Sequence, residues 1–145
     1  MKTDKPLAYF LAARLMEKSP YHWHWGDEEV RRCIMPPIEE GLYVYGYYND
    51  DYNGDMLEPC FFATYAFPEL EHVAEYEKTG MFPREGFYGQ GNTPWIVDFI
   101  CVSGMRDIMG SFRYLKAMFS DLGYDNAQWL RTATGKRGWH KLKGD

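Results

Sequence analysis

Residues 95–102 form the apolar run that most constrains how this chain can fold. They read Trp-Ile-Val-Asp-Phe-Ile-Cys-Val, with Asn-Thr-Pro before them and Ser-Gly after them. A short β-branched and aromatic run of this kind predicts a strand that is buried on both faces. Its one charged residue, Asp98, is costly to bury as an ionised carboxylate unless it is hydrogen-bonded or paired. Asp98 therefore either anchors the structure or takes part in chemistry.

The composition predicts one globular domain over residues 1–145, which is long enough for a substantial core. The aromatic share is 18%, with 12 Tyr and 5 Trp, and such a surplus favours grooves and interfaces as well as core packing. No apolar segment approaches the roughly 20 residues that span a bilayer. The N-terminus also lacks the features of a signal peptide. We therefore expect a cytoplasmic protein without a membrane span.

The formal net charge of −5 is unevenly distributed along the chain. Acidic side chains are in excess over residues 1–103, and basic side chains are in excess over residues 104–145. The overall sign argues against general nucleic-acid binding. The basic last third suits an acidic partner or a cofactor that carries phosphate.

Neither the cysteines nor the histidines predict a metal site. Cys33, Cys60 and Cys101 are far apart, odd in number and surrounded by apolar residues, so we expect buried reduced thiols. His22 and His24 would face the same way in an extended segment, but no third or fourth ligand lies near them in the sequence. One of these imidazoles could instead act as a general base, since its pKa lies near the working pH, or serve only a structural role.

The N-terminal part of the chain predicts two helices. Apolar residues follow helical spacing over residues 5–18, and Asp4 is the expected capping residue. A second helix is expected over residues 28–35, with Asp27 as its N-cap and an acidic first turn that suits the helix dipole. The Pro36-Pro37 pair should break this second helix.

The rest of the chain predicts a sheet with further helices. Strands are expected over residues 42–48 and 59–67, joined by a turn at Asn53-Gly54. The later elements are expected to be a short helix within residues 68–79, a Gly- and aromatic-rich loop over residues 80–93, the strand at 95–102, a helix closed by Gly123, a strand over residues 127–134, and a short basic strand or tail over residues 135–143. This order predicts a single α+β or α/β domain.

The segment from Ser103 to Ser111 joins the expected strand at 95–102 to a helix. Backbone N–H groups at such a helix N-terminus attract phosphate or another anion. Many α/β proteins turn from strand to helix through glycine without binding anything, so a purely structural role stays open. The candidate residues of this segment for binding a cofactor or group donor that carries such an anion, called the donor-binding residues below, are Ser103, Gly104, Arg106, Gly110 and Ser111.

Several short motifs, taken in order, resemble those of the bacterial RTX toxin-activating lysine acyltransferases. Residues 19–22 read Ser-Pro-Tyr-His after a helix, and residues 35–38 read Met-Pro-Pro-Ile before a hairpin. Residues 95–100 read Trp-Ile-Val-Asp-Phe-Ile and precede a glycine loop and a helix. The family has similar Ser-Pro-x-His, Leu-Pro-x-Ile and Trp-x-x-Asp-Trp-Ile motifs. The resemblance extends over about residues 5–134.

The resemblance implies a GNAT-like fold, an α/β sandwich in which helices flank a central, mostly antiparallel sheet. It implies transfer of a fatty acyl group from acyl carrier protein to a lysine amine of a protein acceptor, with no tightly bound cofactor. On the matching positions His22 is the catalytic base, Asp98 is its partner, and Arg131 is the arginine of the late strand. A homodimer is left open.

Two other functions remain open. The aromatic surplus and the altered loops fit a non-catalytic GNAT-like binding or inhibitor protein, or a virion-associated protein, of a phage or mobile element. An N-acetyltransferase that uses acetyl-CoA is the third candidate. The Arg/Gln-x-x-Gly-x-Gly/Ala loop of acetyl-CoA enzymes is absent, because Arg106 to Ser111 matches it only distantly, and this disfavours acetyl-CoA as the donor.

Overall fold

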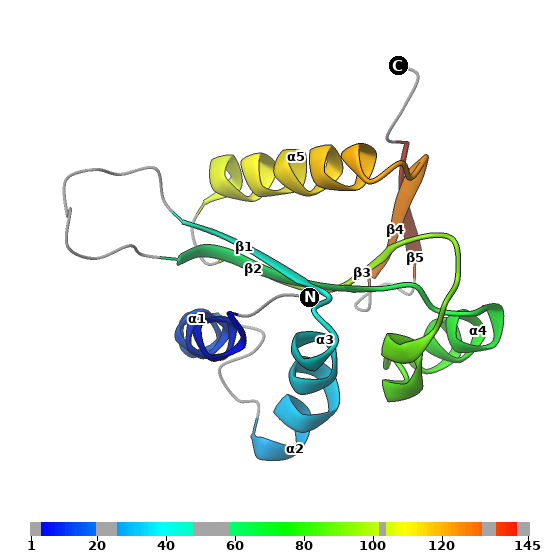
Figure 1. Cartoon of the computed structure of the whole chain (residues 1–145), viewed down its shortest axis with the longest axis horizontal. Helices are drawn as coiled ribbons and strands as arrows, with labels where there is room; N and C mark the ends of the chain where they lie inside the picture. The colour runs from blue at the N-terminus through cyan, green and yellow to red at the C-terminus, as the bar shows by residue number, and fades with distance from the viewer. Residues whose placement is uncertain (1–3, 20–25, 48–58, 102–103, 132–135, 142–145) are drawn as a thin grey trace.

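The computed structural model describes residues 4–19, 26–47, 59–101, 104–131 and 136–141. It confirms an α+β domain (Figure 1). The elements in chain order are α1 (Lys5–Lys18), α2 (Asp27–Glu29), the π-helical turn η1 (Val30–Ile34), α3 (Met35–Glu39), β1 (Tyr43–Tyr47), β2 (Pro59–Ala66), α4 (Leu70–Thr79), the 3-10 turn η3 (Arg84–Tyr88), β3 (Trp95–Cys101), α5 (Met105–Asp121), β4 (Asn126–Arg131) and β5 (Lys136–Lys141).

The strands form one five-stranded sheet in the order β1-β2-β3-β4-β5. Neighbouring strands are antiparallel except for β3 and β4, which are parallel and joined through α5. Helix α5 covers one face of the sheet, while α1, α2, α3 and α4 lie on the other face (Figure 1). The sheet is therefore the middle layer between two helical layers.

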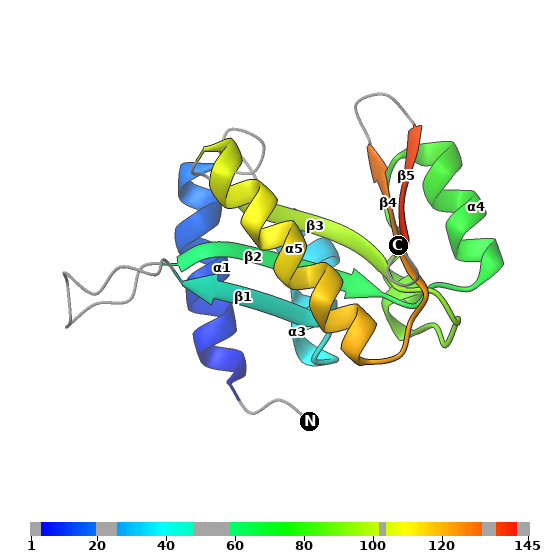
Figure 2. The same ribbon diagram turned by 90° about the horizontal axis from the view of Figure 1, so that it is seen from above.

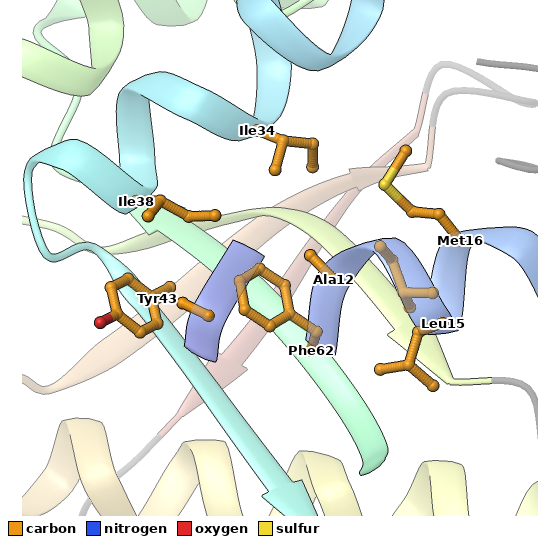
Figure 3. Close-up of a cluster of buried hydrophobic side chains, with 9 residues drawn as sticks. Ala12, Leu15, Met16, Ile34, Ile38, Tyr43 and Phe62 are labelled. Atoms are coloured by element: carbon orange, nitrogen blue, oxygen red, sulfur yellow. The ribbon is translucent and has the colours of Figure 1, made fainter. Parts of the chain in front are cut away.

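The core consists of three apolar clusters, one beneath each group of helices. The first cluster packs α1 and α3 against β1 and β2, and Figure 3 shows its side chains converging between these elements. The second lies beneath α5, with Leu115 and Phe119 packed on the sheet. The third lies beneath α4 and η3, around Tyr76 and Trp95.

Every residue of β2 is buried, whereas β3, which the sequence predicts to be buried on both faces, is not. In β3 only Trp95, Ile96 and Ile100 are buried, and the other residues are half-buried. The reason is the neighbouring strand: β3 and β4 pair only at Trp95–Gln128 and Ile96–Trp129 in the described part of the chain. Figure 2 shows β4 and β5 rising away from β1, β2 and β3 beyond this point.

Two expected helix starts differ from the structure. Asp4 does occupy the N-cap position of α1, but its side chain makes no capping hydrogen bond and instead accepts hydrogen bonds from the hydroxyls of Tyr43 and Tyr45. The N-cap of α2 is Gly26 and not Asp27, with the Gly26 N–H donating to Oε2 of Glu29 at 3.0 Å. In each case a partner outside the expected local pattern determines the geometry.

The proline pair also acts differently from the prediction. Pro36 and Pro37 do not end the helical segment but lie in the first turn of α3, after the π-helical turn η1. The expected loop over residues 80–93 contains the 3-10 turn η3, which the sequence does not predict. The other elements match their predicted types, and residues 136–141 form a strand that pairs with β4. The antiparallel pairing of β1 with β2 confirms the hairpin, whereas its predicted turn at Asn53-Gly54 lies outside the described residues.

Candidate functional site

Asp98 lies in the middle of β3, one residue after a β-bulge. Thr64 of β2 pairs with Asp98, and the following Tyr65 pairs with Ile96, so Val97 is the extra residue. The backbone N–H of Asp98 donates to Oγ1 of Thr64 at 3.1 Å, which fixes the backbone directly beside the bulge. Bulges of this kind re-aim side chains and occur next to active sites more often than elsewhere.

The carboxylate of Asp98 faces the layer that contains α1, α3 and α4. Alternate residues of a strand share a face, and Ile100 belongs to the cluster beneath α1 and α3. The Oδ2 atom of Asp98 is shielded from solvent. The negative charge of Asp98 helps to raise the pKa of two side chains from the helical layer, Cys33 of η1 and Tyr76 of α4. Cys33, Tyr76 and Asp98, which come from η1, α4 and β3, are therefore close enough to interact electrostatically.

The environment of this cluster keeps both the thiol and the phenol protonated. Burial, followed by the charge of Asp98, raises the pKa of Cys33 from 9.0 to about 12. Burial also raises the pKa of Tyr76 above its ordinary 10.0, with smaller contributions from Asp98 and Cys33. Tyr76 is held by edge-on contacts with the rings of Phe82 and Trp95. At neutral pH each group can donate a hydrogen bond to an anionic atom placed among them.

The π-helical turn positions Cys33, and the local sequence explains why it forms. Prolines 36 and 37 have no N–H, so neither can make the hydrogen bond to the residue four positions earlier that continues an α-helix. The N–H of Met35 instead donates to the carbonyl of Val30, five residues earlier. Such π turns are rare and frequently occur at functional sites.

A cleft of about 680 Å³ opens between α2–η1 and α4–η3. Its walls include Arg32 and Glu75, which are the sequence neighbours of Cys33 and Tyr76. The lining residues are Asp27, Glu28, Arg31, Arg32, Glu75, Pro83, Arg84 and Glu85. Apart from one proline, every lining residue is charged.

His22 lies outside the described residues, so its proposed contact with Asp98 stays a prediction. The described chain ends on one side at Ser19, which is buried and whose N–H donates to the carbonyl of Met16 at 3.2 Å. It resumes at Gly26, directly before the residues of α2 that line the cleft. His22 therefore belongs to the segment that joins α1 to the wall of the cleft.

Three of the predicted donor-binding residues lie on the other side of the sheet from Asp98 (Figure 1). Arg106, Gly110 and Ser111 line a groove of about 490 Å³ between the first turns of α5 and the β1–β2 hairpin. Ser111 uses its hydroxyl within the helix, donating to the carbonyl of Asp107 at 2.7 Å. The groove also contains Tyr45, Gly46, Cys60, Phe61, Arg113 and Tyr114.

The other predicted donor-binding residues are only partly described. Gly104 is the N-cap of α5, in extended conformation. Arg131 ends β4 opposite Lys136, but its side chain, like all of Ser103, lies outside the described part of the chain. The described pairing of β3 with β4 stops after Ile96. The edge of β3 beyond this residue adjoins both faces of the sheet, the one that carries Asp98 and the one covered by α5.

Sequence reasoning missed Cys33 and Tyr76 as members of the site. The sequence predicts only a buried thiol at Cys33, and Tyr76 is only one residue of the short helix expected within residues 68–79. All three cysteines are free, in line with the prediction, although only Cys60 is buried and Cys33 and Cys101 are half-buried. No sequence signal links residues 33, 76 and 98, because the fold alone brings them together.

A scan against families of known proteins and a search of curated proteins both found no match to this chain. Within the described residues, no helix is long and apolar enough to cross a membrane. The same part of the chain contains no group of three or more His, Cys, Asp or Glu side chains that could hold a metal ion.

Proposed function

We propose that this protein is a GNAT-like acyltransferase that moves an acyl group from a pantetheine thioester to a protein lysine. The observation that carries the proposal is the geometry around Asp98. The parallel pair β3–β4 opens after two residue pairs, and Asp98 lies two residues beyond the last pair, next to a bulge. A carboxylate on a strand with an open edge suits a site that receives an extended, amide-bearing ligand.

The open edge of β3 supports a pantetheine arm as this ligand. Beyond Ile96 the described register with β4 contains no further pairs, so this edge of β3 has no β4 partner there among the described residues. An extended ligand with amide groups can add to such an edge through main-chain hydrogen bonds. On the face covered by α5, Arg106 and the start of the helix add positive charge that suits phosphate.

The reaction requires a base at this position. A lysine ammonium has an ordinary pKa of about 10.4 and must lose its proton before it can attack a thioester carbonyl. In the proposal, neutral His22 takes this proton and Asp98 stabilises the resulting imidazolium. The amine nitrogen then forms the amide bond, the C–S bond breaks, and the thiolate that leaves takes up a proton.

The experiment measures intact mass after incubation of the protein with a lysine-containing acceptor and one of two donors. The donors are acyl carrier protein loaded with fatty acids of different lengths, which is the preferred donor, and acetyl-CoA. We expect the acyl mass to appear on the acceptor with wild-type protein and to vanish with His22→Ala. Folded protein that transfers nothing from either donor would overturn the proposal and favour a non-catalytic binding protein.

A further inference from the structure

We infer that the charged cleft between α2–η1 and α4–η3 binds the acceptor, and that the acceptor is a lysine flanked by acidic residues. This inference rests on the proposed acyl transfer for its biological meaning, but the binding itself does not require a donor. Arg32 and Glu75, which line the cleft, are the sequence neighbours of Cys33 and Tyr76, and the charge of Asp98 contributes to the pKa of both of these groups. The cleft lies between helical segments on the side of the sheet that Asp98 faces (Figure 1).

The described charged side chains that line this cleft do not pair with one another. Within the described residues, none of the seven charged side chains that line it forms an ion pair or a side-chain hydrogen bond. Opposite charges four residues apart on an α-helix usually form ion pairs. The spacing of Asp27 and Arg31, and of Glu28 and Arg32, would therefore predict two such pairs. Here Arg31 and Arg32 lie in the π turn, where the spacing differs from that of an α-helix.

The contrast within the same structure is Lys5 and Glu39, whose Nζ and Oε2 atoms lie 3.2 Å apart. That pair shows that close ion pairs form elsewhere on this surface. Among the residues that the structure describes, the cleft instead presents unpaired guanidinium groups from Arg31, Arg32 and Arg84 alongside unpaired carboxylates. A surface that displays both signs without internal pairing is complementary to a ligand that carries both signs.

The positions of the charges favour a lysine within an acidic segment. Guanidinium groups bind carboxylates through paired hydrogen bonds, so the three arginines suit glutamate or aspartate side chains of the acceptor. Carboxylates from both walls, such as Glu28 and Glu75, attract an ammonium group. Cys33 and Tyr76, the sequence neighbours of the lining residues Arg32 and Glu75, are neutral and do not repel this cation.

Binding without any donor tests the inference. A fluorescently labelled peptide with one lysine between glutamates is titrated with protein and followed by anisotropy, alongside peptides with glutamine in place of glutamate or norleucine in place of lysine. We expect each replacement to weaken binding about tenfold, since each removes charge-assisted contacts. Equal binding of the three peptides would overturn the inference. Competition by free lysine as strong as that by the peptide would also overturn it.

Two variants with the same charge change locate the binding site. Arg84→Glu places a like charge in the cleft and should weaken binding of the glutamate peptide about tenfold or more. Lys78→Glu changes an exposed residue of α4 that does not line the cleft, and should leave binding nearly unchanged. Equal losses with the two variants would overturn the assignment to this cleft. Peptide binding with no acyl transfer would instead refute only the proposed function.

Discussion

The hydroxyl oxygen of Thr64 accepts a hydrogen bond from the backbone N–H of Asp98 at 3.1 Å. Thr64 is fully buried in β2, and Asp98 follows the bulge of β3, so a side chain here fixes the backbone where the two strands fall out of register. The contact connects β2, in which every residue is buried, to the strand that carries the carboxylate of the site. Thr64 is therefore a positioning residue for Asp98.

Replacing Thr64 tests this relationship. Thr64→Val keeps the shape but removes the acceptor, which leaves a buried N–H group without its partner. We expect the free energy of unfolding to fall by about 1–3 kcal/mol, measured by urea denaturation. Thr64→Ser is the matched control, because it keeps the hydroxyl while losing a methyl group. A loss for Thr64→Ser larger than that for Thr64→Val would show that packing, and not the hydrogen bond, is what matters.

Asp98→Asn tests the role of the carboxylate in the proposed transfer. The substitution retains the size of the side chain but removes the charge that would stabilise the imidazolium of His22. We expect kcat for acyl transfer to fall by about 10²-fold or more, since a positioned acid–base system contributes about that much. The measurement is acyl transfer under saturating donor, with circular dichroism to verify folding. A folded Asp98→Asn protein with unchanged kcat would assign Asp98 a structural role only.

The sequence predicts most of the fold because helical and strand periodicity are local properties. The spacing of apolar residues over 5–18 matches α1, and the run at 59–67 matches β2. The same local reasoning gives the wrong role for Asp4, because its partners Tyr43 and Tyr45 lie about forty residues away in sequence. It also treats the proline pair as a terminator, whereas the chain continues through a π turn.

The site is less predictable than the fold. Asp98 is conspicuous in the sequence because a charge in an apolar strand needs an explanation. Cys33 and Tyr76 are not, since each fits its own element as an ordinary core residue. The charged cleft likewise cannot be recognised in the sequence, because its walls come from α2, η1, α4 and η3, which meet only when the helices pack on the sheet.

Substitution of Asp4 distinguishes a helix cap from a tertiary acceptor. Serine is as good a capping residue as aspartate, so Asp4→Ser would be nearly neutral if Asp4 served α1 alone. In the structure both carboxylate oxygens accept hydrogen bonds from tyrosine hydroxyls. We therefore expect Asp4→Ser to lower the free energy of unfolding by about 2 kcal/mol. In a double-mutant cycle with Tyr45→Phe the two losses should be less than additive, and full additivity would contradict the contact.

The raised pKa of Cys33 predicts how the free energy of unfolding changes at alkaline pH. The pKa of Cys33 is raised on folding from 9.0 to about 12, so the folded protein holds this proton more tightly than the unfolded chain does. The stabilisation is complete below pH 9 and is lost as the pH rises toward 12. The extra slope is less than about 1.4 kcal/mol per pH unit, since Cys33 is only partly buried. Urea denaturation at several pH values should show a shallower decline for Cys33→Ser, and identical slopes would contradict the raised pKa.

Two glycines should respond to alanine in opposite directions. A Cβ atom on Gly91 would lie 2.3 Å from the backbone carbonyl oxygen of Pro68, which cannot move aside as a flexible side chain would. Gly91→Ala should therefore destabilise the protein by about 1–3 kcal/mol, like other overpacked positions. Gly110 lies within α5, and a Cβ atom there would meet nothing within 4 Å among the described residues, so Gly110→Ala should stabilise the helix by about 0.5–1 kcal/mol. Thermal unfolding of both variants checks the pair, and a destabilised Gly110→Ala would mean that α5 needs its glycine for a reason other than space.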